Sequence, residues 1–426
     1  MSGLSFCVGV VGGVGAWAFR LLIGLLHNLF FLGKFQLDYD ANLHTAASPW
    51  GVGIILVPVI GGLAVVWLVK TFAPEAKGHG VPEVIDAIHF QGGRIRPIVA
   101  AVKSLASAIC IGSGGSVGRE GPIIQIGSAF GSTLGQLCKV PTRQRITLIA
   151  AGAAAGIAAT FNAPLGGIVF AIELLLISVN YRNLLPVALA TVTASYIGSV
   201  LLGTYPAFDF EPLRIPNFQA VSPVTLLLFV PFGVLMGLAS VLFIKGIYWA
   251  EDFFDSLPVN DYVRHIFGMS GVGLSLLATW HLAGHYYIEG VGYATIMDII
   301  VGTLTNPGFL LLLCLLKFVA TCLTLGSGGS GGVFSPALFV GAALGASFAH
   351  IGQSLFPGLD CDVVTFTLAG MAAGVGASTG AVLTATIMLH ELTDDVNSTL
   401  PIILTTFIAC AVRKLISPES IYTLKL

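Results

Sequence analysis

Two glycine-rich segments of identical sequence contain the residue types best suited to binding chemistry. Gly-Ser-Gly-Gly-Ser occurs at 112–116 and at 326–330, and Gly-x-x-x-Pro follows at 118–122 and at 332–336. Proline is tolerated in the first turn of a helix, because the amide that it lacks has no partner inside the helix. The free amides at a helix N-terminus carry a partial positive charge and bind anions. The spacing therefore predicts a site for a small anion.

One ionisable residue stands beside the first of these helix starts. Glu120 lies between Gly118 and Pro122, whereas the second segment has Phe334 at the matching position. A carboxylate there can occupy the ring of amides itself, and its protonated form can leave and admit an anion. We interpret Glu120 as a gate that couples the site to pH. The alternative is a structural ion pair with the neighbouring Arg119.

A third glycine cluster precedes another proline. Gly78, His79 and Gly80 come directly before Val81 and Pro82, and this order again predicts a helix N-terminus at a cavity. The imidazole of His79 can donate a hydrogen bond to an anion or titrate near neutral pH, although a single histidine is more often a packed interface residue. His79 is therefore a candidate anion contact.

The composition places these segments in a membrane. Hydrophobic residues make up 55% of the 426 residues and charged residues only 9%, whereas a soluble domain has about a quarter charged residues. Several apolar runs are shorter than the roughly 20 residues of a crossing helix. With 53 glycines, the chain is expected to form closely packed, interrupted helices, which are typical of transport pathways. We expect an all-α polytopic membrane protein.

The remaining composition argues against other classes. A net charge of −2 leaves no basic surface for nucleic acid, and the seven cysteines include no Cys-x-x-Cys pair, so we expect neither disulfides nor a metal framework. The first glycine segment lacks the surrounding strands and the lysine of a nucleotide-binding loop, and no cofactor is expected. A remote alternative is an intramembrane metalloenzyme using His281, His285 and Glu289, whose two imidazoles share a helical face. A polar helix end explains the same residues.

The glycine segments belong to an internal duplication. Their offset of 214 residues also relates Lys103 to Lys317, and a later offset of 218 relates Glu173 to Glu391. We therefore expect one transmembrane domain over 1–426. The predicted halves are 1–220 and 221–426, with repeat cores at 103–174 and 317–392.

The linkers that follow the two copies differ in charge. The first carries Lys139, Arg143 and Arg145, whereas the second carries Asp360 and Asp362 and neither lysine nor arginine. Positive charge marks the cytoplasmic side of a membrane, so the copies are expected to cross in opposite directions, unless the charges are placed by accident. An inverted repeat brings both helix starts toward the membrane centre from opposite sides.

Four motifs in this order resemble the CLC family of chloride channels and chloride/proton exchangers. They are GHGVPE at 78–83, GREGP at 118–122, GVFSP at 332–336 and the tyrosine of SIYTLKL at 420–426. The resemblance covers nearly the whole chain. It implies two inverted repeats of tilted, partly broken helices in the lipid bilayer, and a homodimer in which each subunit has its own pore.

Carried over by position, the resemblance makes Glu120 the gating glutamate. It assigns backbone amides to a central and an outer anion site, and a phenolic hydroxyl to the central one. The residues so assigned are Val333, Phe334 and Tyr422 at the central site and Arg119 and Gly121 at the outer site. The usual serine of the family's first motif is replaced by His79, which leaves the preference among chloride, nitrate and fluoride open.

A second departure from the family concerns protons. Family exchangers usually carry paired glutamates after Asn-Ala-Pro-Leu-x-Gly-Ile, whereas 162–168 leads here to Glu173 followed by Leu174. The inner proton position is thus lost at Leu174, as in family channels, although a hydrated path can still carry protons. We interpret Glu173 as structural, because its repeat partner Glu391 also ends an apolar run.

The sequence therefore predicts transport rather than enzyme activity. The main expectation is passive or weakly proton-coupled chloride transport through a glutamate-gated pore, and the alternative is chloride/proton antiport. The chain ends four residues after Tyr422, so we expect no cytoplasmic regulatory domain. Compact loops favour a prokaryotic inner membrane.

Overall fold

The computed structural model describes residues 1–203, 208, 222–358, 361–393, 395 and 397–425, and most of these residues are helical. Nine helices of this part of the chain are long and apolar enough to cross a membrane. They are α1 (Ser2–His27), which continues as a π-helical turn at Asn28–Leu32, α2 (Leu56–Phe72), which a 3-10 turn at Gly51–Ile55 precedes, α6 (Thr142–Phe161), α8 (Tyr181–Leu202), α9 (Pro223–Ser256), α10 (Asp261–Ala283), α12 (Pro307–Gly326), α13 (Phe334–Leu355) and α16 (Thr399–Ile416).

Shorter helices complete the described fold. They are α3 (Val81–His89), α4 (Ile98–Gly112), α5 (Glu120–Leu137), α7 (Pro164–Phe170) with a π-helical end at Ala171–Leu175, α11 (Tyr293–Val301), α14 (Val363–Thr379) and α15 (Val382–Thr393). Three of them, α3, α5 and α11, begin at the buried residues Val81, Glu120 and Tyr293, as the glycine segments predicted for α3 and α5.

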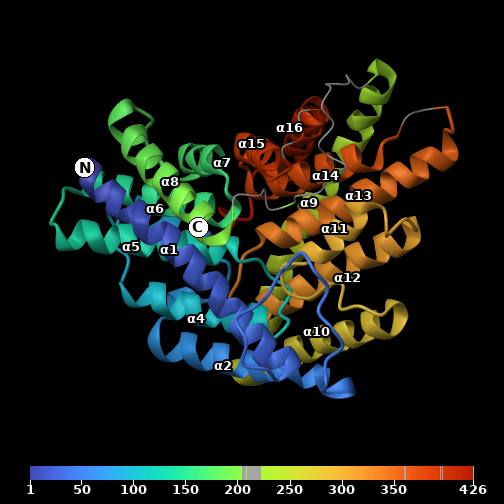
Figure 1. The fold of residues 1–426 in the computed structure, drawn as a ribbon, viewed down its shortest axis with the longest axis horizontal. Helices are drawn as coiled ribbons and strands as arrows, with labels where there is room; N and C mark the ends of the chain where they lie inside the picture. Colours follow the sequence, from blue (N-terminus) through green and yellow to red (C-terminus); the bar gives the residue numbers. More distant parts are fainter. Residues whose placement is uncertain (204–207, 209–221, 359–360, 394, 396, 426) are drawn as a thin grey trace.

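The same pair of closely packed helices occurs in both halves. In Figure 1, α5 and α6 lie on the left, and α13 and α14 lie on the right. A Cβ atom at Gly127 would lie 2.2 Å from the backbone oxygen of Gly152 on α6, and a Cβ at Gly341 would lie 2.1 Å from that of Gly370 on α14. These two contacts keep the repeat offsets, so the duplicated glycines bring α5 against α6 and α13 against α14 in the same way.

Apolar runs that are continuous in sequence are broken at matching places. The run at 146–177 divides where Asn162 adopts the left-handed conformation (φ 54°), and Pro164 then begins α7. The run at 364–390 divides at Gly380 (φ 82°), and α15 follows. Asparagine and glycine tolerate positive φ better than other residues and so end helices. Each break divides one apolar run into a longer helix followed by a shorter one.

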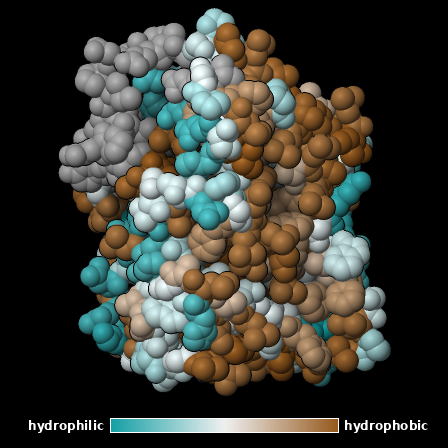
Figure 2. All heavy atoms as spheres, turned by 90° about the vertical axis from the view of Figure 1, so that its right-hand side faces the viewer, coloured by the Kyte–Doolittle hydropathy of each residue, from teal (hydrophilic) through white to brown (hydrophobic). Residues whose placement is uncertain are grey.

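Hydrophobic side chains cover much of the outer surface. Figure 2 shows the face at the right of Figure 1, where hydrophobic residues dominate and hydrophilic ones gather toward one side. Exposed apolar side chains on the helices include Leu227, Leu242, Phe267 and Leu315. Burying such a surface in lipid removes it from water, which fits the predicted multi-pass membrane protein.

Two sequence predictions fall partly on residues outside the described part of the chain. The boundary between the predicted halves, at 220 and 221, lies there, as does Asp360 of the second linker. The residue bounds of the two halves and of the two repeat cores stay predictions.

Candidate anion-binding site

Three glycine segments meet at the centre of the molecule. The amide of Gly118 donates to the oxygen of Gly332 at 2.7 Å, and the amide of Gly332 donates back to Gly118 at 2.6 Å. Gly78 is joined to the second segment in the same manner, because its amide donates to Gly329 at 3.0 Å and its oxygen accepts from Gly331 at 3.1 Å. The predicted convergence of the helix starts is therefore present in the structure.

Glycine is required where these segments cross. A Cβ atom at Gly121 would lie 2.2 Å from the backbone oxygen of His79 and 3.0 Å from the Cα of Gly332. Real Cβ atoms do not approach backbone so closely, so any larger residue would push α5 away from α3 and α13. The absence of a side chain at Gly121 lets the three helix starts share one small volume.

Unpaired amides surround that volume. The first amides of a helix have no partner inside the helix, and the loop hydrogen bonds of the described residues use neither the amides of Val333 and Phe334 nor those of Arg119 and Gly121. Val333 and Phe334 are 1% and 6% exposed and begin α13, while Arg119 and Gly121 flank the start of α5. Buried amides of this kind need an acceptor, and an anion supplies one.

The carboxylate of Glu120 lies between the two halves of the protein. The residue is 1% exposed, and its Oε1 accepts hydrogen bonds from the hydroxyls of Tyr293 at 2.7 Å and Ser335 at 2.5 Å. No ion pair among the described residues joins Glu120 to Arg119. The guanidinium carbon of Arg119 lies instead 5.4 Å from the ring centre of Tyr293. The geometry thus gives no support to the structural ion pair.

Tyr293 and Ser335 were missed by the sequence analysis. Tyr293 begins α11 after Gly290-Val-Gly292, and this segment repeats Gly78-His-Gly80 at an offset of 212 residues. That offset was a usable signal for a fourth helix start. Ser335 lies within the motif at 332–336, and nothing in the sequence distinguished its hydroxyl from other buried serines.

His79 and Tyr422 approach each other on the side of α3. Their ring centres lie 5.8 Å apart, and the two residues are 5% and 2% exposed. The Nδ1 atom of His79 is buried and has no hydrogen-bond partner among the described residues. The imidazole therefore has a free ring nitrogen in the interior, and its role as an anion contact stays a prediction.

The chain around Tyr422 is fixed by buried polar groups. The hydroxyl of Tyr248 donates to the oxygen of Ile421 at 2.5 Å. Arg413, which is 1% exposed, donates to the oxygen of Pro418 at 2.7 Å. These bonds hold the end of the chain against the centre of the molecule, where Tyr422 lies.

Two repeat-related lysines hold the loops before α3 and α11. Lys103 Nζ donates to the oxygens of Ala76 at 3.1 Å and Gly78 at 2.7 Å. Lys317 Nζ donates to the oxygens of Ile288 at 3.0 Å and Gly290 at 2.6 Å. Both lysines are fully buried. Each one therefore orients the glycine loop that precedes a helix start.

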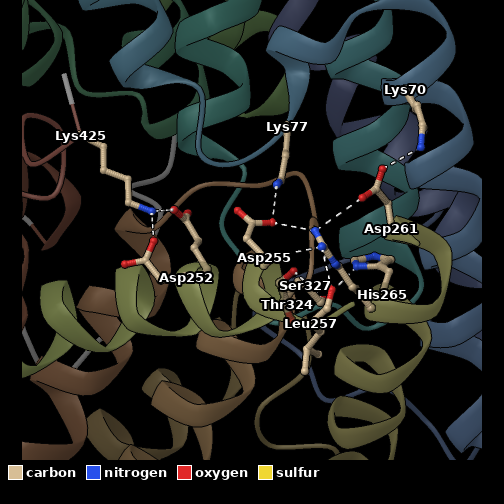
Figure 3. Close-up of polar contacts among 12 residues, drawn as sticks. Lys70, Lys77, Asp252, Asp255, Leu257, Asp261, His265, Thr324, Ser327 and Lys425 are labelled. Atoms are coloured by element: carbon tan, nitrogen blue, oxygen red, sulfur yellow. Dashed lines mark hydrogen bonds and ion pairs between the residues drawn. The ribbon is translucent and has the colours of Figure 1, made fainter. Parts of the chain in front are cut away.

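Further contacts anchor the glycine loops to α9 and α10, as Figure 3 shows. They are the ion pair of Lys77 with Asp255 at 3.9 Å, that of Lys425 with Asp252 at 2.8 Å, and the hydrogen bond of His265 Nδ1 with Ser327 Oγ at 2.8 Å. Because Lys77 precedes Gly78 and Lys425 follows Tyr422, these contacts steady two of the segments that form the site.

Two cavities lead toward the site. One of about 400 Å³ is lined by Arg20, Asp40 and Arg119 and so reaches the residue next to Glu120. Another of about 500 Å³ is lined by Pro82, Glu83 and Lys425, next to α3 and the Tyr422 segment. The first is suited to deliver an anion to the Glu120 side, because two arginines line it.

Glu173 and Glu391 cap helices of the opposite half. Glu173 accepts from the amides of Leu383 at 2.9 Å and Thr384 at 2.7 Å, at the start of α15. Glu391 accepts from the amide of Gly166 at 2.7 Å, at the start of α7. Carboxylates at helix N-termini are stabilising, so the geometry supports a structural role for Glu173. Leu174 is half-buried and packs against the hydrophobic core.

The metal-site alternative finds no counterpart in the structure. Glu289 hydrogen-bonds Thr45 and lies 3.5 Å from His27 Nε2, while the ring of His285 stacks on that of His44 with centres 4.3 Å apart. Among the described residues, no group of three or more histidine, cysteine, aspartate or glutamate side chains is placed to hold a metal ion.

A membrane fold with duplicated helix starts around a buried amide ring defines an anion transporter. The model of the family described as voltage gated chloride channel matches residues 61–414, and the chain belongs to this family, as the motifs predicted. Members of this family are transporters and not enzymes. The predicted fold class, two inverted-topology repeats in a multi-pass membrane protein, is confirmed by the likeness to solved structures.

Curated relatives cover nearly the whole chain. The H(+)/Cl(-) exchange transporter ClcA of Vibrio parahaemolyticus is 33% identical over 428 residues, which cover 98% of this chain and 87% of the relative. ClcA of Vibrio cholerae is 31% identical over 435 residues, covering 99% and 87%. These bacterial relatives agree with the predicted prokaryotic membrane.

Two solved structures share the fold. A slow cyanobacterial Cl−/H+ antiporter has a TM-score of 0.83 at 24% identity, and a CLC-type fluoride/proton antiporter has a TM-score of 0.77 at 25% identity. Each likeness covers 98% of this chain and 95% of the solved one. The homodimer that the family resemblance implies stays a prediction.

Proposed function

We propose that this protein exchanges chloride for protons, with Glu120 as the group that both ions use. The observation that carries the proposal is the burial of the Glu120 carboxylate at the start of α5, next to helix amides that the loop hydrogen bonds of the described residues leave unused. A carboxylate and a chloride ion compete for such amides, and only protonation removes the competitor. One side chain can therefore alternate between blocking the anion and carrying a proton.

The relatives favour exchange over the passive conduction that Leu174 suggested. The two Vibrio proteins named above, which match almost the full chain, carry names that specify H(+)/Cl(-) exchange. Leu174 removes an acid from the inner position without closing a hydrated route. The cavity beside Glu83 offers space for water next to α3, and we propose that protons pass through it between Glu120 and the inner solution.

Proton movement in proteoliposomes tests the proposal. Vesicles loaded with chloride are diluted into low-chloride medium, and external pH and chloride are recorded together. Exchange predicts that chloride efflux drives protons inward against a proton gradient, in a fixed ratio that a protonophore abolishes. Chloride efflux with no uphill proton movement would support the passive alternative. Vesicles without protein provide the baseline.

The anion contact of His79 gives a second test. Replacing it with alanine removes a buried side-chain donor from the loop before α3, and we expect chloride affinity to fall about fivefold, the value of one neutral hydrogen bond. His79→Ser should restore most of the affinity, because a hydroxyl also donates. Calorimetric titration with chloride, nitrate and fluoride measures both effects.

His350 supplies the control for this test, because its Nε2 is also buried without a partner among the described residues but belongs to the far end of α13. His350→Ala should leave anion binding unchanged. Equal binding by the wild type and His79→Ala would remove His79 from the site.

A further inference from the structure

We propose that the hydroxyls of Tyr293 and Ser335 form a latch that holds the Glu120 carboxylate in place and limits the rate at which the gate opens. The inference rests on the proposed gating role of Glu120 and extends it to two positioning residues. Tyr293 begins α11 and Ser335 lies in the first turn of α13, so the second half of the protein supplies the latch and the first half supplies the gate.

The three polar groups form a closed triangle. Glu120 Oε1 lies 2.7 Å from the Tyr293 hydroxyl and 2.5 Å from that of Ser335, and the two hydroxyl oxygens lie 3.0 Å apart. The three residues are each 1% exposed or less, so water does not compete for these bonds. Glu120 Oε2 has no partner among the described residues. The carboxylate is therefore held through one oxygen, by two donors.

The tyrosine hydroxyl is held in a fixed position by packing around its ring. The ring of Phe208 meets that of Tyr293 edge-on, with centres 5.1 Å apart, and the guanidinium of Arg119 lies on it. Behind the ring, Gly292 has a φ of 79°, and Lys317 binds the loop through Gly290. A hydroxyl that cannot move is a preorganised donor, which needs no reorganisation to hold a charge.

The latch distinguishes the two protonation states of the gate. A carboxylate can accept from both hydroxyls at once, and hydrogen bonds to a charged acceptor are roughly twice as strong as neutral ones. Once Glu120 is protonated, both bonds lose this charge assistance. Lys317 and Tyr422 also lie within electrostatic reach of Glu120, and Arg119 adjoins it in the chain. Protonation therefore weakens the two hydrogen bonds and lets the Glu120 side chain move away from the hydroxyls.

Removing one donor should speed the gate. We expect Tyr293→Phe and Ser335→Ala each to raise chloride turnover about tenfold, the effect of losing one hydrogen bond to a charged group. Turnover is measured as initial chloride efflux per protein from proteoliposomes. Tyr287→Phe is the matched control, because Tyr287 is a buried tyrosine of the loop before α11 whose ring contacts His44, His285 and Phe309. The turnover of this variant should equal that of the wild type.

The same two substitutions in a Glu120→Ala background separate a latch from a merely structural role. A latch acts only through Glu120, so Tyr293→Phe and Ser335→Ala should not change turnover once the carboxylate is gone. An equal change in both backgrounds, or unchanged turnover of both variants in the presence of Glu120, would overturn the proposal. Uphill proton movement is recorded in the same wild-type vesicles; its absence would contradict the exchange function, whereas the rate comparison alone decides on the latch.

Discussion

Glu120→Gln is expected to abolish proton movement and to leave a chloride flux that no longer varies with pH. Glutamine fills the same volume, but its amide neither binds a proton in this range nor carries the charge that competes with chloride for the helix amides of α5 and α13. We expect chloride affinity to rise about tenfold, because a neutral side chain replaces an anion in direct competition. Proteoliposome fluxes at several pH values, together with calorimetric titration, measure both changes.

Glu289→Gln is the control for this prediction. Glu289 is another largely buried carboxylate, but its side chain contacts Thr45 and His27 and is not part of the starts of α5 and α13. This variant should keep the pH dependence and proton movement of the wild type. A Glu120→Gln protein that still moves protons uphill would show that another group carries them.

Replacing either buried lysine is expected to produce the second large effect. Lys317→Met leaves the oxygens of Ile288 and Gly290 without their donor in a fully buried position, at a cost of about 1–3 kcal/mol for each unsatisfied group. Lys103→Met removes one donor each from the oxygens of Ala76 and Gly78, which keep their bonds from Ser330 and Gly331, so its effect should be the smaller of the two. The glycine loops before α3 and α11 then lose contacts that fix their geometry. We expect chloride affinity to fall at least about tenfold and the thermal stability in detergent to decrease.

Lys70→Met controls for the loss of a lysine as such. The side chain of Lys70 is 57% exposed and pairs with Asp261 at the surface, and such pairs contribute little to stability. Its affinity and melting temperature should stay close to those of the wild type. Wild-type chloride affinity in Lys103→Met and Lys317→Met would contradict a role for these lysines in forming the site.

The architecture of the site could be predicted because the sequence motifs that form it are duplicated. The duplicated glycine segments and their prolines correctly placed the starts of α5 and α13, and α3 begins at Val81 as expected. α11 was missed, because its glycines have Val291 between them where the first copy has His79, and no proline follows. Without a proline or an acid, the segment carried no chemical signal of a helix start.

Contacts between the halves were the least predictable part. The hydroxyls of Tyr293 and Ser335 reach Glu120 across 173 and 215 residues of chain, and Glu173 caps a helix that begins more than 200 residues later. Sequence periodicity reports on neighbours along one helix and does not register such pairs. Leu174 illustrates a different limit of sequence analysis. One apolar residue at the inner proton position does not determine whether water molecules complete the proton path.

The voltage at which net chloride movement stops tests proton-coupled exchange most directly. Proteoliposomes with fixed chloride and proton gradients are clamped by potassium and valinomycin, and chloride movement is recorded at each voltage. Exchange predicts that this voltage differs from the chloride equilibrium potential and shifts when only the proton gradient is changed. A voltage equal to the chloride equilibrium potential at every proton gradient would contradict coupling and identify a passive pathway.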